Sequence, residues 1–169
     1  MDKSSMIRMY YSLENDTNEL GSTIHFDERN LDTFGIRVYN LLFISCNLFE
    51  LAAKETVCDP ESNMNTWKEN PRIRLYSRVE LTFIPMGCKF KPMGALGEND
   101  VKKRNLAWWQ DYNSVKHDLT QIHKATLRNL IYALGSAGLL VSEIARPPIG
   151  MSYTPKRSVL FDYLAFPKQ

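Results

Sequence analysis

The sequence predicts a mostly α-helical protein with a small β-strand or hairpin insertion. Apolar residues recur at helical spacing over residues 31–54 and again over residues 119–144. Between these stretches, residues 72–83 alternate apolar and polar side chains, which is the period of a strand or a short hairpin. A length of 169 residues with 44% hydrophobic residues fits one domain with its own core. We therefore expect a single domain over residues 1–169.

The first strong helix is predicted over residues 31–54, because their apolar side chains return every three or four positions. Asp32 or Thr33 can cap its start. Its polar face includes Glu50 and Lys54, which stand in the order that supports a helical ion pair. These two side chains are open to two interpretations, a surface ion pair or a contribution to a site.

A strand or short hairpin is predicted over residues 72–83, where Ile73, Leu75 and Leu81 fall on alternate positions. This pattern is typical of a strand that is buried on one face. The following residues, 85–99, hold two prolines and three glycines. Both residue types favour turns, so this stretch predicts a loop, which could fold over a site.

The next helix is expected to begin at Asn99 or Asp100, which can cap it, and to lead into Trp108 and Trp109. Its first turn carries adjacent cations that end at Arg104. Cations beside aromatic side chains are typical of RNA-binding surfaces, although a solvated charged turn is the alternative. The net charge is only +2, so binding of nucleic acid would depend on such a local patch.

The most informative stretch is WWQDYNSVKHD, residues 108–118. A helix there places Asn113, Lys116 and His117 on one face, because side chains three and four positions apart are neighbours. An imidazole can act as acid or base near neutral pH, an amide can orient it or a substrate oxygen, and an ammonium can hold an anion. Together they predict a site that handles a phosphate group. The alternative is a solvated polar face with one histidine in a helix contact.

The last long helix is predicted over residues 119–144, which carry a broad apolar stripe. Gly135 and Gly138 would allow another helix to approach closely, so the stripe is expected to form core and could also form a dimer interface. Pro147 is expected to stop the helix. The tail over residues 145–169 is too apolar to remain disordered, and we expect it to pack on the domain or on a partner.

Several classes of protein are disfavoured by the composition. The N-terminus has no apolar run of signal-peptide length, and the most apolar stretch, residues 130–144, is interrupted by Gly, Ser and Glu. We therefore expect a cytoplasmic protein that does not enter a membrane. Cys46, Cys58 and Cys88 are widely spaced and form no CxxC pair, so neither a disulfide framework nor a metal site is expected. No cofactor is expected.

Three segments together resemble a known family: FELAAK at residues 49–54, WWQDYNSVKHD at 108–118 and ATLRNLIYAL at 125–134. The combination is similar to the HEPN superfamily of small helical proteins, and within it to a bacterial branch with a YNxxKH signature. The resemblance covers residues 31–144. It implies an up-and-down helical bundle that dimerises. The active members are metal-independent endoribonucleases of toxin–antitoxin, CRISPR-linked and abortive-infection defence systems.

Active HEPN members carry an Arg a few residues before a His. In this chain His117 aligns with that His, but Tyr112 stands where the Arg would be, so a planar, permanently charged phosphate clamp is missing. Lys116, Arg104 or Arg128 could supply the charge instead. The site that the resemblance implies comprises Tyr112, Asn113, Lys116 and His117 as catalytic residues, and Arg104, Trp108, Trp109, Glu50 and Lys54 as substrate-binding residues.

Two functions from different classes stay open. As an endoribonuclease, the chain would use His117 to take the proton from a ribose 2′-hydroxyl or to give one to the leaving 5′-oxygen, while Lys116 stabilises phosphate charge. As a non-catalytic HEPN-like module, it would hold the same residues in a buried polar network or use them to bind a nucleotide, RNA or protein. The expected partners are RNA or a nucleotide, a second copy in a homodimer, and a cognate antitoxin or defence-system protein.

Overall fold

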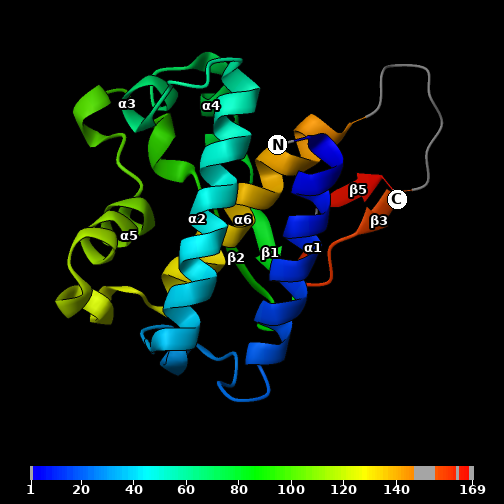
Figure 1. The fold of residues 1–169 in the computed structure, drawn as a ribbon, viewed down its shortest axis with the longest axis vertical. Helices are drawn as coiled ribbons and strands as arrows, with labels where there is room; N and C mark the ends of the chain where they lie inside the picture. The colour runs from blue at the N-terminus through cyan, green and yellow to red at the C-terminus, as the bar shows by residue number, and fades with distance from the viewer. Residues whose placement is uncertain (1, 147–154, 163, 168–169) are drawn as a thin grey trace.

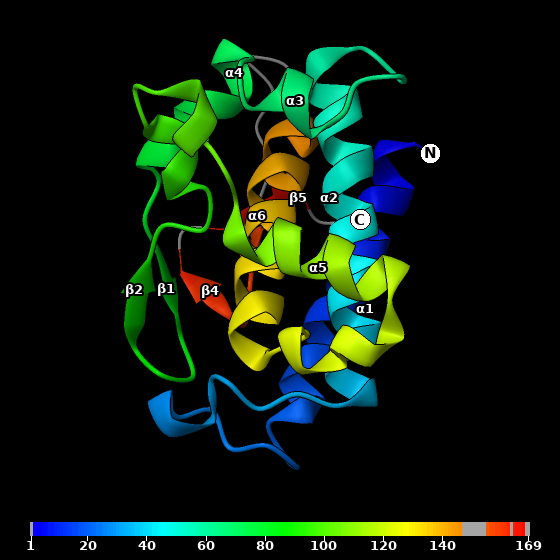
Figure 2. The same ribbon diagram turned by 90° about the vertical axis from the view of Figure 1, so that its left-hand side faces the viewer.

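The computed structural model describes residues 2–146, 155–162 and 164–167, and it confirms a mostly α-helical fold. Two helices lie side by side at the centre, α2 (Ile36–Val57) and α6 (Leu127–Ala145) (Figure 1). Helix α1 (Lys3–Leu20) packs along one side of this pair, and α5 (Ala107–His117) lies across the other side (Figure 2).

Shorter elements complete the described chain. Two are α-helical turns, α3 (Met64–Trp67) and α4 (Pro71–Arg74). The 3-10 turns are η1 (Glu28–Asn30), η2 (Leu75–Arg78), η3 (Gly94–Gly97), η4 (Val101–Lys103) and η5 (Leu119–Lys124). The strands are β1 (Leu81–Phe83), β2 (Cys88–Phe90), β3 (Pro155–Arg157), β4 (Phe161–Asp162) and β5 (Ala165–Pro167).

Helix α1 is an element that the sequence analysis did not predict. Its sequence is rich in Ser, Asn and acidic residues, and only one narrow face is apolar. That face buries Met6, Tyr10 and Leu13 against the central pair. The Asp2 carboxylate caps the helix by accepting a hydrogen bond of 2.7 Å from the backbone N–H of Ser5.

Helix α2 begins at Ile36, and the expected caps Asp32 and Thr33 do not start it. The residues before it are extended and pair with the start of α6: the Thr33 carbonyl accepts from the backbone N–H of Leu127 at 2.8 Å. The Asp32 carboxylate forms an ion pair of 3.2 Å with Arg128 instead of capping. The prediction of the helix start was therefore wrong, because these residues form a tertiary contact with the start of α6.

The strand predicted over residues 72–83 is confirmed only at its end, where β1 forms an antiparallel hairpin with β2. The first part of this stretch is helical, in α4 and η2. The reason is local: the Asn70 side chain accepts hydrogen bonds from the backbone N–H groups of Arg72 and Ile73, and Pro71 occupies the first helical position. Within the predicted loop, residues 88–90 form the second strand of the hairpin.

The predicted helix from Asn99 into the tryptophans is divided in two. Asp100 caps only the short turn η4, and α5 begins at Ala107. Between them Arg104 turns inward and donates hydrogen bonds to backbone carbonyls, which fixes the break. The predicted last helix is divided in the same way, into η5 and α6, and Thr126 caps the start of α6 by accepting from the N–H of Asn129.

The described part of the tail packs onto the domain. Strand β4 pairs with β1 on the side opposite β2, and β3 pairs with β5. On α1 the buried Glu14 carboxylate accepts hydrogen bonds from the Ser158 hydroxyl and from the backbone N–H groups of Val159, at 3.1 Å, and Leu160, at 3.3 Å. Pro147, which was expected to stop the last helix, lies outside the described residues.

Helix α6 is enclosed by the other elements, so its apolar stripe is core. Gly138 permits the close approach of α1, because a Cβ there would lie 2.8 Å from Tyr10 Cε2 and 2.5 Å from Leu164 Cδ1. At Gly135 a Cβ would lie 3.1 Å from Leu81 Cδ1, where the hairpin covers the helix. In the described chain the stripe is therefore occupied by contacts within the molecule and is not left free for a dimer.

Among the described residues, α2 is the one helix that is long and apolar enough to cross a membrane by length and composition. Half of its apolar window is buried inside the protein, against α1, α5 and α6. Core helices of water-soluble domains meet the same criteria. The observation is therefore weak support for a membrane span, and the central position of α2 accounts for its hydropathy.

Candidate functional site

Helix α5 divides the sequence-predicted site between its two faces. Trp108, Trp109 and Tyr112 point inward and are buried, whereas Lys116 and His117 are exposed. This division follows from the helical period, since the inward positions recur every three or four residues. The predicted catalytic and binding residues therefore do not form one cluster.

Trp108 and Trp109 belong to an aromatic core. The ring of Phe49 on α2 lies with its centroid 5.1 Å from that of Trp108 and 5.6 Å from that of Trp109, and Trp67 packs beside them. Trp108 is 2% exposed, and its indole N–H donates to the Pro92 carbonyl at 3.0 Å. Neither tryptophan can offer a ring face to a base, so their burial contradicts the expected role in binding substrate.

Arg104 is buried, and its side chain donates hydrogen bonds to the backbone. Its Nε donates to the Glu98 carbonyl at 2.7 Å, and its two terminal nitrogens donate to the carbonyls of Asn99, at 3.1 Å, and Lys68, at 3.4 Å. A guanidinium bonded to three carbonyls joins distant segments of the chain. The expected role of Arg104 in holding phosphate is therefore wrong.

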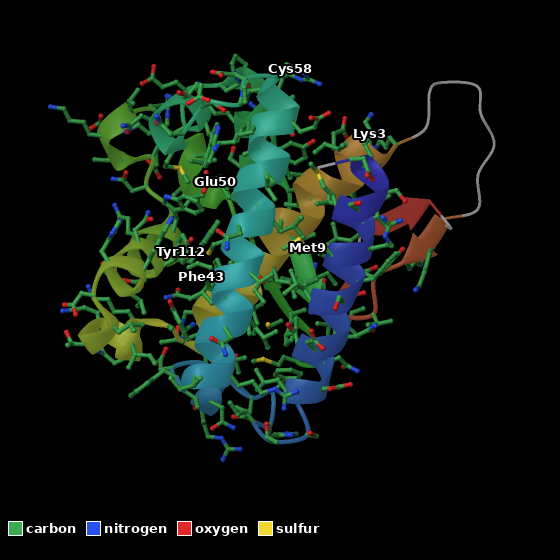
Figure 3. The ribbon with its side chains drawn as sticks, in the orientation of Figure 1. Lys3, Met9, Phe43, Glu50, Cys58 and Tyr112 are labelled. Carbon is green, nitrogen blue, oxygen red and sulfur yellow. The ribbon has the colours of Figure 1, made fainter. Side chains whose placement is uncertain are left out.

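Tyr112 lies between α5 and α2, beside Phe43 (Figure 3). It is 1% exposed, and its hydroxyl donates to Asn47 Oδ1 at 3.3 Å. Burial raises the pKa of Tyr112 well above its ordinary value, and the neighbouring Cys46 and Glu50 raise this pKa further. The phenol therefore stays neutral at physiological pH and does not replace the arginine of the HEPN motif electrostatically.

Replacing Tyr112 by Phe is expected to lower the free energy of unfolding by only about 0.5–1.5 kcal/mol, because the ring contacts persist and one long hydrogen bond is lost. Chemical denaturation monitored by circular dichroism measures this change. A loss above about 3 kcal/mol would contradict this account of the phenol.

The exposed face of α5 carries the remaining predicted residues. His117 is the last residue of the helix, and neither its side chain nor that of the half-buried Asn113 forms a hydrogen bond or ion pair with another described residue. The Lys116 Nζ lies 5.5 Å from the centroid of the Tyr112 ring, at cation–π distance. These exposures contradict the alternative in which Lys116 and His117 form a buried network.

Glu50 and Lys54 form an ion pair of 2.8 Å on α2. Each side chain is about one third exposed, and the hydrogen bond that Lys54 donates to the Glu50 carboxylate raises the pKa of Lys54. Glu50 lies on the side of α2 that faces Tyr112 (Figure 3), and its charge contributes to the raised pKa of that phenol. The pair thus borders the α5 face without contacting His117 or Lys116 in any described interaction.

Turn η5 adds a cation that the sequence analysis did not include. The Lys124 Nζ donates to the Ser114 hydroxyl at 3.3 Å, so η5 folds back along α5. Lys124 therefore lies beside Ser114 on α5, and the exposed Lys116, His117 and Asp118 stand at the end of that helix. Because a continuous helix is predicted over residues 119–144, the sequence does not predict that η5 folds back along α5.

Two further observations concern cations. Arg128, offered as a substitute for the missing arginine, forms an ion pair with Asp32 and lines a cleft with Lys91 and Trp108. Among the residues that the structure describes, no three His, Cys, Asp or Glu side chains are arranged as metal ligands.

No family model, curated protein or solved structure matches this chain. The resemblance to HEPN proteins therefore rests on the residues of the YNxxKH segment and its flanking helices.

Proposed function

We propose that this chain is a HEPN-like, metal-independent endoribonuclease that acts as a homodimer in a bacterial defence or toxin–antitoxin setting. The observation that carries the proposal is the free polar face of α5. Asn113 and His117 are not engaged by other described residues, and Lys116 is exposed beside them. Polar side chains that do not stabilise the fold are available for a ligand.

The chemistry follows from the side chains on this face. The His117 imidazole is accessible to solvent, so it can take the proton of a ribose 2′-hydroxyl or protonate a leaving 5′-oxygen. Lys116 and Lys124 supply positive charge that favours the approach of a phosphodiester. One histidine cannot perform both proton transfers at once, and a second copy would provide the other.

Exposed apolar side chains on α2 and at the start of η5 support dimerisation. On the outer side of α2, Ile36 is 67% exposed and Ile44 is 38% exposed, and Leu119 directly after α5 is 62% exposed. Covering them with a second copy would remove apolar surface from water. Such a contact would place a second His117 in the same assembly. A cognate antitoxin or defence-system protein is proposed to act on this same assembly in the cytoplasm.

The second candidate function is a non-catalytic module that binds RNA, a nucleotide or a protein. It is favoured by the partners that two arginine side chains already have. Arg104 donates hydrogen bonds to backbone carbonyls, and Arg128 forms an ion pair with Asp32. Neither Arg104 nor Arg128 is therefore free to take the place of the motif arginine on the α5 face. Lys116 alone would bind a phosphate without clamping its geometry.

Cleavage of end-labelled total RNA in EDTA distinguishes these functions. The wild-type protein is expected to cleave RNA and to leave 2′,3′-cyclic phosphate ends, and His117→Ala is expected to reduce cleavage about 100-fold or more, since general acid–base catalysis contributes 10²–10⁴-fold. The exposed His25→Ala is the matched control and should cleave normally.

The same variants are compared by thermal denaturation. The exposed position of His117 predicts a change within about 0.5 kcal/mol, so loss of cleavage would report on chemistry and not on folding. Metal-dependent cleavage with 5′-phosphate ends would overturn the nuclease mechanism. RNA binding without cleavage, weakened by Lys116→Ala, would establish the non-catalytic module instead.

A further inference from the structure

A cleft of about 310 Å³ is lined by residues at the start of α5 and at the start of α6. It lies between the starts of α5 and α6 and the turn η3. Its polar lining is formed by Lys91, Asn105, Arg128 and Asn129, and its apolar lining includes Leu106, Ala107, Trp108 and Tyr132. This volume lies at the lower end of the range of about 300–1,000 Å³ that is typical of small-molecule sites.

The polar lining favours an anion. Lys91 and Arg128 carry positive charge, and Asn105 is an exposed amide at the rim. Among the described residues that line the cleft, none carries a carboxylate. Two acids nearby contact residues that line the cleft. Asp32 forms an ion pair with Arg128, and Asp111 accepts a hydrogen bond of 2.9 Å from the Asn129 amide.

Arg128 is held loosely enough to engage a ligand. Its ion pair with Asp32 joins two solvent-accessible side chains, 46% and 80% exposed, at 3.2 Å. Exposed pairs of this kind contribute little to stability, because water and salt compete with them. A carboxylate or phosphate in the cleft could therefore replace Asp32 as the partner of the guanidinium, which binds such groups in a bidentate manner.

The apolar wall of the cleft favours a planar ligand. Tyr132 packs against Phe90 with ring centroids 4.7 Å apart, which fixes the orientation of its ring. The exposed Ala107 continues the wall, and the buried side chains of Leu106 and Trp108 lie behind it, where the indole of Trp108 is fixed by its hydrogen bond to the Pro92 carbonyl. Rigid aromatic and aliphatic side chains favour a ligand with an aromatic ring, which can pack against them at small entropic cost.

We propose that this cleft binds a small aromatic anion, with the anionic group on Arg128 and Lys91 and the ring against Tyr132 and Ala107. The site is separate from the exposed face of α5, because its walls come from the first residues of that helix and from α6, whereas His117 is the last residue of α5. The binding test of this cleft is therefore independent of the test of the proposed nuclease activity.

Titration of ¹⁵N-labelled protein with 1-naphthyl phosphate tests the proposal. Saturable shifts are expected in the backbone amides of Ala107, Trp108, Arg128 and Asn129, with 1-naphthol and inorganic phosphate each binding more weakly. Arg128→Gln is expected to weaken binding about tenfold or more, because a charge-assisted contact is lost. Arg8→Gln, on the exposed face of α1, is the matched control and should bind like the wild type.

A second variant tests the cleft without removing charge. Ala107 is exposed at the first position of α5, so Ala107→Phe fills the cleft while the core stays intact, and it should abolish the shifts. Melting temperatures equal to the wild type verify folding of each variant. The proposal is overturned if no shift saturates at millimolar ligand, if Arg128→Gln binds as tightly as the wild type, or if Ala107→Phe still binds.

Discussion

Replacing Phe49 by Ala is expected to lower the free energy of unfolding by about 3–5 kcal/mol, the range for deleting a fully buried aromatic ring. Phe49 is 0% exposed, and its ring centroid lies within 5.1–5.8 Å of those of Trp67, Trp108 and Trp109. The variant would leave a cavity where α2 meets α5. We expect the melting temperature to fall by about 6–20 °C for a domain of this size.

Phe34→Ala provides the matched control, because the same substitution is made at a side chain that is 51% exposed. Its effect is expected to stay within about 0.5 kcal/mol. Thermal and urea denaturation of the two variants measures the difference. A loss below about 1 kcal/mol for Phe49→Ala would show that the tryptophans do not fix α5 through this ring.

Replacing Glu14 by Ala is expected to lower the free energy of unfolding by about 2–4 kcal/mol, because buried donors would lose their acceptor. Glu14 is 2% exposed and accepts from the Ser158 hydroxyl and from the N–H groups of Val159 and Leu160. No other described carboxylate bonds these groups. Release of this segment would also weaken the pairing of β4 with β1.

Hydrogen exchange locates this effect. In Glu14→Ala the amides of Val159, Leu160 and Phe161 are expected to exchange faster. The amides in the middle of α2 are expected to change only as much as the global free energy of unfolding changes. Asp16→Ala, an exposed carboxylate on the same helix, is the control and should change neither quantity. Unaltered exchange at Val159 and Leu160 would contradict the role of Glu14 in holding the tail.

The two central helices and the hairpin could be predicted in outline because their apolar patterns are long and regular. The boundaries could not, since contacts between distant segments decide them. Residues before Ile36 were expected in the helix, but their carbonyls accept hydrogen bonds from the start of α6. Helix α1 was missed because its buried stripe is narrow and its other faces are polar.

For the candidate site, the sequence identified the common face of Asn113, Lys116 and His117, whose spacing requires only that α5 be helical. It could not show which chemically suitable residues were already occupied. Arg104 and Trp108 have side chains fit for binding nucleic acid, yet one is bonded to backbone carbonyls and the other is packed in the core.

By itself the sequence determined the helical character of this protein and the common face of the α5 triad, because both depend on local periodicity. The tertiary structure decided which of the predicted side chains remain available, since burial and hydrogen bonding depend on residues far apart in the chain. It also formed the cleft beside Arg128, whose walls come from segments around residues 91–95, 105–108 and 128–132. No local pattern brings those segments together, because only packing of α5 and α6 against the hairpin does so.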